Sequence, residues 1–245
     1  MKIALITGAS GGIGSETVKV FAEDGFFVLG IYNRGAKEIE DLREFLKEKG
    51  LSEYFFAYKC DLKSETEIDA VINSINKSFA HIDVLVNNAG ADLFKLITET
   101  SAQEWDDIFA VNVKSAFLFT KFALKSMIDR KRGKIVNVSS VWGASGASVE
   151  TAYSASKAAL IGFTKATAKE VAESGINVNC VSPGVVDTKM NDCFTEEEKR
   201  ELVERTPLSR MGSPKEIAEL IYFLSSDKAA FITGQNIVCD GGFIL

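Results

Sequence analysis

Tyr153 and Lys157 have the spacing that most directly suggests acid–base chemistry in this chain. They lie four residues apart in a helix-compatible stretch, so both side chains should project from one face of a helix. A free phenol ionises only at about pH 10 and exchanges protons poorly at neutral pH. A neighbouring ammonium favours the phenolate, so we expect Lys157 to lower the pKa of Tyr153. Pairs of this kind are also common on helix surfaces, so the interpretation depends on what else reaches them.

Ser140 and Asn112 are two polar residues that we expect near this pair. Ser140 follows an apolar run over 134–139 that predicts a buried parallel strand. Ligands bind at the carboxyl ends of such strands in open α/β sheets. Asn112 falls among apolar residues in a long helical stretch over 101–130. A buried asparagine needs hydrogen-bond partners, so Asn112 either holds a water near the pair or only satisfies a neighbouring loop.

The amino-terminal segment is typical of a phosphate-binding loop. An apolar strand over 3–6 is followed by a glycine-rich turn over 7–14 and by helical periodicity over 16–24. Backbone N–H groups at such a helix start bind a pyrophosphate, and glycine lets backbone approach closely. The predicted cofactor contacts in this loop are Gly8, Ser10, Gly11, Gly12, Ile13 and Gly14.

The end of the second predicted strand, over 26–32, indicates which dinucleotide binds. In dinucleotide folds an acidic residue here bonds the ribose hydroxyls, whereas a basic residue accommodates a 2′-phosphate. This chain has Asn33 and Arg34 here, and no carboxylate. The pattern favours NADP(H) over NAD(H), with Arg34 as the phosphate ligand. The alternative is that Arg34 is an ordinary arginine in a solvated loop.

Three further strand ends supply the remaining candidate contacts. The predicted strands run over 54–60, 82–86 and 176–181. Asp61 is placed either to meet an adenine edge or to cap the next helix. The cofactor contacts predicted at these ends are Asp61, Leu62, Asn88, Ala89, Gly90, Pro183, Gly184, Val186 and Thr188.

Six strands alternating with helices, and a last strand over 234–239, predict a doubly wound parallel sheet. This is a Rossmann-like α/β fold with three layers, in which helices cover both faces of the sheet. We find no linker or repeat, so residues 1–245 are expected to form a single domain. The polar, charged segment over 185–213 is expected to act as a substrate lid.

Composition excludes several other classes. The net charge of -6 argues against nucleic acid as a partner. No apolar run is long enough to span a bilayer, and the signal-like start is broken at Thr7, so no membrane partner and a cytoplasmic location are expected. The four cysteines lack metal-ligand spacing and His81 is the single histidine. We therefore expect neither a metal site nor a Ser–His–Asp hydrolase.

Taken in order, these segments resemble the short-chain dehydrogenase/reductase family over the whole chain. Residues 7–14 are similar to its T-G-x-x-x-G-I-G cofactor loop, and residues 87–90 are similar to its N-N-A-G segment. Residues 183–184 resemble the P-G turn beside the nicotinamide. The residues that match its catalytic tetrad are Asn112, Ser140, Tyr153 and Lys157.

The resemblance implies an NADP(H)-dependent oxidoreductase that reduces a carbonyl group without a metal. Tyr153 would give the proton to the substrate oxygen, and Ser140 would hydrogen-bond that oxygen. Lys157 would hold the nicotinamide ribose, as well as lower the pKa of Tyr153. Asn112 would position a water that relays protons to Lys157. Tyr153 and Lys157 therefore count among the cofactor contacts too.

Within the family, the length and the chain end resemble bacterial 3-oxoacyl-[acyl-carrier-protein] reductases of fatty acid biosynthesis. This implies a small-molecule or carrier-bound ketone substrate, and a homotetramer or homodimer built on the long helices. Gly12 stands where many such enzymes carry Arg or Lys, so the 2′-phosphate would depend on Arg34. Basic residues lie at 130–134, but residues 170–175 are acidic where an arginine is common. Docking of an acidic carrier therefore stays open.

A second resemblance concerns segments 138–150, 186–190 and 194–198. They are similar to bacterial reductases that act on an aminopentanone group attached to a lysine of elongation factor P. Trp142 would either line the mouth of the pocket or pack under the lid or at a subunit interface. The alternative from another class is a non-catalytic NADP-binding sensor or scaffold. Such a protein has no need of Tyr153 and Lys157 together.

Overall fold

Seven short apolar segments pair into one all-parallel sheet with the order β3-β2-β1-β4-β5-β6-β7. The structure is a computed structural model that describes residues 1–244, apart from the side chain of Cys193. The prediction of a doubly wound Rossmann-like sheet is confirmed, and the last predicted strand completes it. The strands are β1 (Ile3–Thr7), β2 (Phe27–Tyr32), β3 (Phe55–Lys59), β4 (Val84–Asn87), β5 (Gly133–Val138), β6 (Ile176–Pro183) and β7 (Asn236–Cys239).

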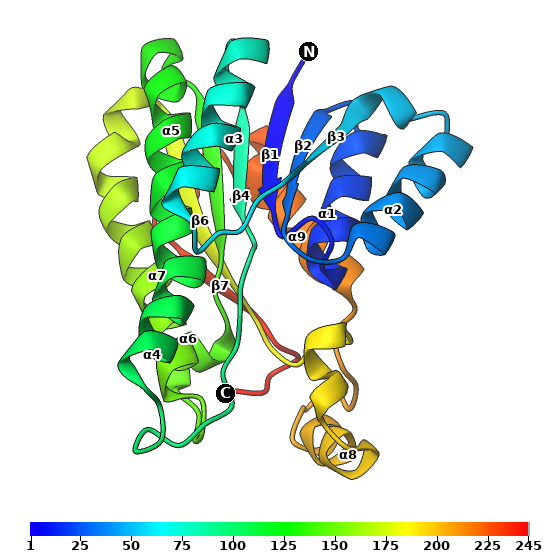
Figure 1. Cartoon of the computed structure of the whole chain (residues 1–245), viewed down its shortest axis with the longest axis vertical. Helices are drawn as coiled ribbons and strands as arrows, with labels where there is room; N and C mark the ends of the chain where they lie inside the picture. Colours follow the sequence, from blue (N-terminus) through cyan, green and yellow to red (C-terminus); the bar gives the residue numbers. More distant parts are fainter. Residues whose placement is uncertain (245) are drawn as a thin grey trace.

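Helices cover both faces of this sheet (Figure 1). One apolar cluster joins the sheet to α1, α2 and α9, and a second joins it to α3, α5 and α7. The remaining helices lie beyond the carboxyl ends of the strands. The helices are α1 (Gly12–Glu23), α2 (Ala36–Glu48), α3 (Glu65–Ser78), α4 (Ala102–Phe109), α5 (Ser115–Arg130), α6 (Val141–Ser145), α7 (Thr151–Val171), α8 (Glu196–Glu204) and α9 (Pro214–Ser225).

Burial on both faces explains why the central strands are apolar at every position. All five residues of β1 are buried. Ala4 and Ile6 pack toward α1 and α9, while Ile3 and Leu5 pack toward α3 and α5. Full burial of each large aliphatic side chain contributes about 1.5–3 kcal/mol. The sheet is therefore a rigid base for the loops that leave its carboxyl edge.

The structure corrects two predicted segments. The helix predicted over 101–130 is interrupted by one π-helical turn, η2 (Ala110–Lys114), which contains Asn112. The loop predicted between β5 and α7 contains the short helix α6, whose amino terminus is capped by the Ser140 hydroxyl. Both departures fall where candidate site residues lie. Segment 185–213 likewise contains one 3-10 turn, η4 (Lys189–Cys193), and α8.

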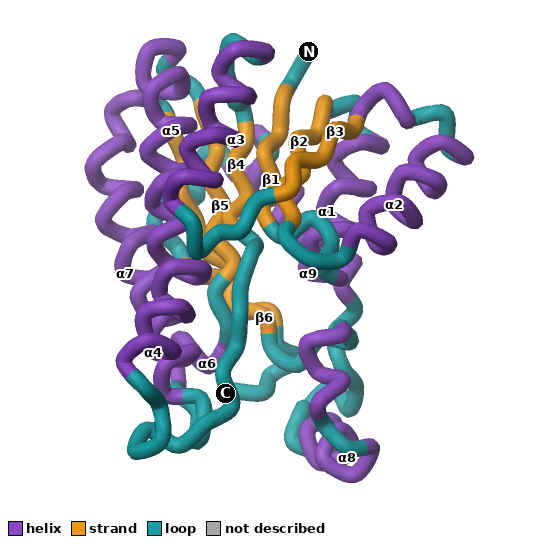
Figure 2. Tube along the Cα trace, viewed as in Figure 1, coloured by secondary structure: helices purple, strands orange, loops and turns teal. Residues whose placement is uncertain are grey.

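The carboxyl ends of the strands meet at the lower side of Figure 1, near α4, α6 and α8. Figure 2 shows long loops converging there. The strand order reverses between β1 and β4, and ligands of doubly wound sheets bind at such a switch point. Among the helices of residues 1–244, none is both long and apolar enough to cross a membrane.

Candidate active site

Ser140 and Tyr153 are brought together by β5, α6 and α7. β5 ends at Val138, and the Ser140 hydroxyl accepts a hydrogen bond from the backbone N–H of Trp142 at 3.2 Å. Tyr153 lies in the first turn of α7 and hydrogen-bonds with Ser140. Both side chains are buried. The two hydroxyls that the sequence predicts as a pair therefore share one site at the carboxyl edge.

Lys157 lies one turn further along α7 and is buried beneath Tyr153. Its Nζ donates a hydrogen bond to the Val138 carbonyl at 2.9 Å and lies 5.6 Å from the centre of the Tyr153 ring. A Cβ built on Gly90 would lie 3.0 Å from this Nζ. The ammonium therefore sits between the end of β5 and the loop after β4, and glycine at position 90 leaves room for it.

Asn112 is held by three side-chain hydrogen bonds. Its Oδ1 accepts from the Ala91 backbone N–H at 2.7 Å, and its Nδ2 donates to the Ala91 carbonyl at 2.9 Å. The same Nδ2 donates to the Ser156 hydroxyl at 2.8 Å. Of the two readings from sequence, these side-chain bonds match the one in which Asn112 satisfies a loop. Single π turns often mark functional positions in helices.

The pKa of Tyr153 differs from the sequence-based expectation. Burial raises it above the usual range, Glu150 and Asp92 raise it further, and the Ser140 hydrogen bond opposes them. Burial outweighs the nearby Lys157 ammonium. Complete burial also lowers the pKa of Lys157 to about 8. Tyr153 is therefore a neutral phenol at neutral pH, which is the form that donates a proton, and the expected net lowering of its pKa is wrong for this structure because burial dominates.

The glycine loop after β1 fits a group that needs close backbone approach. Gly8 has a φ of 71°, and a Cβ built on Gly14 would lie 2.0 Å from the Gly8 carbonyl oxygen. Asn88 Nδ2 donates to the carbonyls of Thr7 and Gly8 at 3.0 and 3.3 Å. Asn88 thus fixes the loop, and its partners are protein backbone. The helix α1 begins at Gly12, directly after the turn, as a pyrophosphate site requires.

The segment after β2 places a free cation beside this loop. The Ser10 hydroxyl donates to the Arg34 carbonyl at 2.8 Å, which ties the two turns together. Asn33 and Arg34 are exposed. Within the described part of the chain, no hydrogen bond or ion pair engages the Arg34 guanidinium. A ribose phosphate at the end of β2 would meet that unpaired charge.

The other predicted contacts are spread along the same edge. Asp61 Oδ1 accepts from the Lys63 backbone N–H at 3.0 Å, while Ser64 caps α3, so capping is not the role of Asp61. Leu62 is buried in the core. Ile13 packs against the other apolar cluster.

The β6 end lies close to the glycine loop. A Cβ built on Gly12 would lie 2.9 Å from Thr188 Cγ2. Pro183 is the last residue of β6, and a Cβ built on Gly184 would lie 2.6 Å from the Asp240 Cβ. Val186 is buried, and its backbone forms an isolated parallel β-bridge with Gly212. The segment after β6 therefore lies directly against the loop after β1.

Two acidic residues at the site were not identified from the sequence. Burial, followed by the charge of Asp92, raises the pKa of Glu150 to about 7, and burial also raises the pKa of Asp92. Both carboxyls act on Tyr153. Glu150 precedes Tyr153 by three residues, which places it on the same side of α7. That spacing is the signal that could have found it.

Ring contacts connect the predicted lid and the chain end to this region. Phe194, after η4, lies 5.4 Å from Phe94 of the loop after β4, centre to centre. Phe243 makes an edge contact of 5.4 Å with Trp142. Trp142 therefore contacts the carboxyl-terminal segment, which is not one of the places expected from the sequence. Lys189 also pairs with Glu38 of α2.

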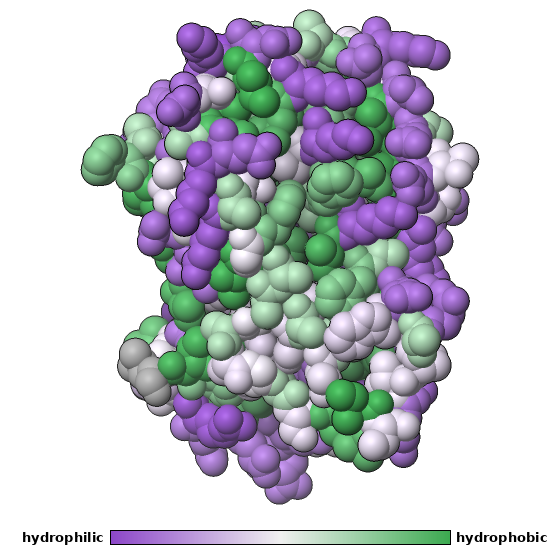
Figure 3. Space-filling model, turned by 90° about the vertical axis from the view of Figure 1, so that its left-hand side faces the viewer, coloured by the Kyte–Doolittle hydropathy of each residue, from purple (hydrophilic) through white to green (hydrophobic). Residues whose placement is uncertain are grey.

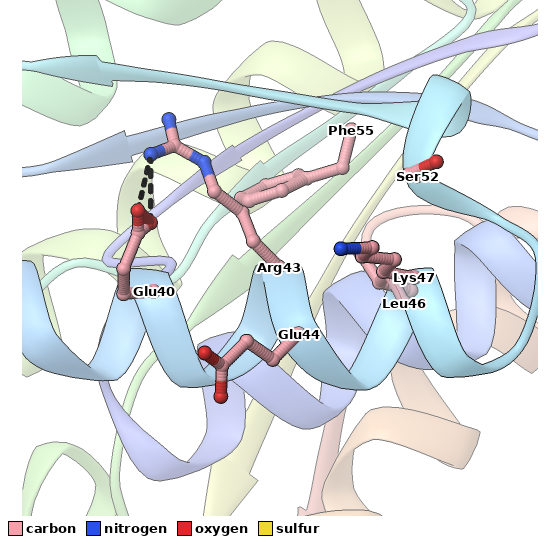
Figure 4. A pocket seen from close by; sticks show the side chains of 7 residues that line it. All are labelled: Glu40, Arg43, Glu44, Leu46, Lys47, Ser52 and Phe55. Atoms are coloured by element: carbon pink, nitrogen blue, oxygen red, sulfur yellow. Dashed lines mark hydrogen bonds and ion pairs between the residues drawn. The ribbon is translucent and has the colours of Figure 1, made fainter.

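Two hollows lie away from this site. One of about 280 Å³ lies between α2 and β3, and Figure 4 shows Arg43 paired with Glu40 there. A larger one of about 820 Å³ is lined by Lys2, Val84 and Gly133 at the amino ends of the strands. Neither is lined by any of the predicted tetrad residues.

The described residues contain no set of side chains suited to bind a metal ion. No group of three His, Cys, Asp or Glu side chains there could hold a metal ion. Cys60, Cys180 and Cys239 are free thiols. The side chain of Cys193 lies outside the described part of the structure.

The sheet order, the glycine loop at its switch point and the buried Ser140–Tyr153–Lys157 group together define a dinucleotide-dependent oxidoreductase fold. A family model described as Enoyl-(Acyl carrier protein) reductase matches residues 8–244. The chain belongs to the short-chain dehydrogenase/reductase family, and it is an oxidoreductase of the kind that acts on a secondary alcohol or ketone.

Curated relatives match along the full length. The chain is 39% identical over 245 residues to the 3-oxoacyl-[acyl-carrier-protein] reductase FabG of Thermotoga maritima, covering 100% of this chain and 98% of the relative. The FabG of Staphylococcus aureus is 39% identical over 244 residues, with the same coverage. The FabG of Vibrio cholerae is 37% identical over 246 residues, again with the same coverage.

Proposed function

We propose that the chain is an NADPH-dependent ketone reductase in which Tyr153 gives a proton to the substrate oxygen. The observation that carries this proposal is the buried phenol of Tyr153, hydrogen-bonded to Ser140 and backed by the ammonium of Lys157. When bound, NADPH supplies a hydride to the carbonyl carbon. A sensor or scaffold would not need a buried cation beneath a buried phenol, because each is costly to desolvate.

The protein's own groups then act on the carbonyl oxygen. As the carbon–oxygen double bond opens, its electron pair moves to oxygen, and the Tyr153 hydroxyl protonates that oxygen. Ser140 hydrogen-bonds the same oxygen and stabilises the charge that develops on it. The phenolate left on Tyr153 is offset by the nearby Lys157 ammonium, which is largely charged at neutral pH because its pKa is about 8.

NADP(H) is proposed as the cofactor because of Arg34. The glycine loop and the start of α1 would hold the pyrophosphate, with Ser10, Gly11 and Gly12 nearest to it. The unpaired Arg34 guanidinium would bind the 2′-phosphate. Gly12 itself offers no charge, and a longer side chain there would meet Thr188. Recognition of the phosphate therefore depends on one exposed arginine.

The names of the curated relatives suggest that the ketone is a 3-oxoacyl thioester and that an acyl carrier protein carries it. Of the basic residues proposed to meet such a carrier, Arg130 is bound to Asp83 at 2.8 Å and Lys134 to Asn177 at 2.7 Å. Lys131 and Arg132 carry no such bond within residues 1–244. The aminopentanone alternative is favoured by a different observation, the acidic pair Asp92 and Glu150.

Segment 185–213 is proposed to close over the substrate in the cytoplasmic enzyme. The support is that its two ends are anchored near the site while its middle is exposed. The Val185 carbonyl accepts from the Gly212 N–H at 2.9 Å, and Phe194 reaches the ring of Phe94. Closure of such a segment excludes water from the reaction.

The cofactor assignment is tested by following NADPH and NADH oxidation with an acetoacetyl thioester, using the wild type and Arg34→Ala. A charge-assisted hydrogen bond contributes about 1.5–3 kcal/mol, so the wild type should prefer NADPH and the variant should lose at least about tenfold in that preference. Arg43→Ala, an exposed arginine of α2 paired with Glu40, is the matched control. A wild-type preference for NADH would overturn the role of Arg34.

A further inference from the structure

Glu38 is an acidic residue that the fold brings to the end of β2. The sequence has no carboxylate directly after this strand, where Asn33 and Arg34 stand. Glu38 lies in the first turn of α2, and its Oε2 would lie 2.9 Å from a Cβ built on Gly35, the residue after Arg34. In dinucleotide folds an acid at this place accepts hydrogen bonds from the ribose hydroxyls, and its charge repels a 2′-phosphate. A carboxylate therefore lies next to the turn that carries the proposed phosphate ligand.

This turn also touches the glycine loop. A Cβ built on Gly35 would lie 2.9 Å from the Ser10 Cβ, and the Ser10 hydroxyl donates to the Arg34 carbonyl. Gly35 has a φ of 81°, a conformation that favours glycine. Ser10, Arg34 and Glu38 therefore lie around one turn at the adenosine end of the proposed cofactor site.

Lys189 reaches the same turn from the segment after β6. It is the first residue of η4 and follows Thr188, whose Cγ2 would lie 2.9 Å from a Cβ built on Gly12. Lys189 Nζ donates to Glu38 Oε1, and this hydrogen bond lowers the pKa of Glu38, so the carboxylate is ionised and paired at neutral pH. The pair therefore joins the predicted lid to α2 at the edge of the glycine loop.

The effect of this pair falls on charge more than on stability. The side chains of Lys189 and Glu38 are 79% and 30% exposed, and exposed ion pairs contribute little to the stability of a fold. Within residues 1–244, Lys189 is the one base that forms an ion pair with Glu38. With Lys189 in place, the pair has no net charge. Without it, a full negative charge would stand near Arg34, whose guanidinium has no partner in the described residues.

We propose that the Lys189–Glu38 pair sets the cofactor preference, because Lys189 cancels a carboxylate that would otherwise repel the 2′-phosphate of NADPH and accept hydrogen bonds from the ribose hydroxyls of NADH. This inference rests on the proposed function, since it concerns the same cofactor site. Arg34 binds the phosphate, whereas Lys189 acts on it through Glu38. Because Lys189 belongs to the predicted lid, the lid takes part in choosing the cofactor.

The test measures the dissociation constants of NADPH and NADH by fluorescence titration, at low ionic strength because salt screens these charges. Lys189→Gln should reduce the preference for NADPH at least about threefold, mainly by weakening NADPH binding. Glu38→Gln should increase the preference by a similar factor, because it removes the carboxylate and leaves the ammonium. The double variant lacks both charges and should return close to the wild-type ratio.

Lys199→Gln is the matched control, since Lys199 is a lysine of the same lid that pairs with Glu196 within α8. It should keep the wild-type ratio. An unchanged ratio in Lys189→Gln would overturn the inference, and so would a loss of preference in Glu38→Gln. Equal weakening of both cofactors by either variant would overturn it as well, because the pair would then only hold the lid over the dinucleotide.

Arg34→Ala, titrated in the same way, separates this inference from the proposed function. If the wild type prefers NADH and Arg34→Ala leaves the ratio unchanged, while the Lys189 and Glu38 variants still shift it in opposite directions, the NADPH assignment fails and the charge pair stands. If the wild type prefers NADPH through Arg34 but neither variant of the pair shifts the ratio, the charge pair fails and the NADPH assignment stands.

Discussion

Tyr153 is the residue at which burial, charge and hydrogen bonding meet. Its phenol is kept protonated by burial and by two acids, and this matches the role of a proton donor in reduction. The identity of the pair Tyr153 and Lys157 could be predicted from spacing, because four residues make one helical turn. The direction of the Tyr153 pKa could not, because it depends on Asp92 and on the depth of burial.

Glu150→Gln should stabilise the protein at alkaline pH. The folded-state pKa of Glu150 is raised to about 7, so folding holds this proton more tightly than the unfolded chain does. Its ionisation therefore costs stability progressively as pH rises from the unfolded value to about 7, and the full cost remains above that pH. The facing titratable groups, Asp92 and Tyr153, stay in place in the variant, and Lys95 stays bound to Glu104.

Urea unfolding at about pH 8 should show Glu150→Gln to be more stable by on the order of 2 kcal/mol. The gain should shrink at about pH 5, where the wild-type carboxyl is protonated in the folded state. A gain of the same size at both pH values would show that the charge of Glu150 is not its cause.

At the scale of elements, the two turns that hold the cofactor edge are fixed by close packing. Gly14 lies inside α1 against the Gly8 carbonyl, and the π turn at Asn112 interrupts the long helix beside the loop after β4. The glycine loop was predictable because its glycines follow a strand and open a helix. The π turn and α6 were not, since the π turn is tied through Asn112 to Ala91 and α6 packs against α7, where Gly143 lies close to the backbone of Lys157.

Gly14→Ala should destabilise the fold, because its new methyl group would lie 2.0 Å from the Gly8 carbonyl oxygen. Overpacking of this kind costs about 1–3 kcal/mol. Gly11→Ala is the control from the same turn, since its Cβ would meet the same oxygen at an ordinary 3.4 Å. Thermal unfolding without cofactor should show a clear loss for position 14 and little change for position 11. Equal melting temperatures would contradict the close packing.

At the scale of the whole molecule, one helical face carries exposed apolar residues. Figure 3, which looks onto the left-hand side of Figure 1, shows apolar and neutral residues across the middle of that face and hydrophilic residues around them. Phe117 and Ile128 of α5 are 46% and 44% exposed. Exposed patches of this kind often mark protein interfaces. The homotetramer or homodimer remains a prediction, and we expect α5 to form its contact surface.

Phe117→Arg should then shift the protein toward monomers in sedimentation velocity experiments, because a charge would be buried in the contact. Phe56→Arg is the control, since Phe56 is 49% exposed on the edge strand β3, away from α5. A monomeric wild type would contradict the prediction, and so would an unchanged assembly of the Phe117 variant.

The class of the sheet could be predicted from the sequence, but its strand order could not, because hydrophobic runs reveal strands and not which strands are neighbours. Seven strand positions and the family motifs were readable from the sequence. The electrostatic effect of Asp92 on Glu150 was not, since these residues are far apart in the chain and their loops follow β4 and β5, which are adjacent only in the sheet. That adjacency also brings Gly90 beside Lys157.

The central claim is proton donation by Tyr153, and Tyr153→Phe tests it most directly. NADPH oxidation should be measured with an acetoacetyl thioester, alongside NADPH affinity by fluorescence titration. We expect the variant to bind NADPH as the wild type does and to lose at least about a thousandfold in kcat, since general acid catalysis contributes about 10²–10⁴-fold. A variant that binds NADPH and still reduces the thioester at a rate close to the wild-type rate would contradict the mechanism.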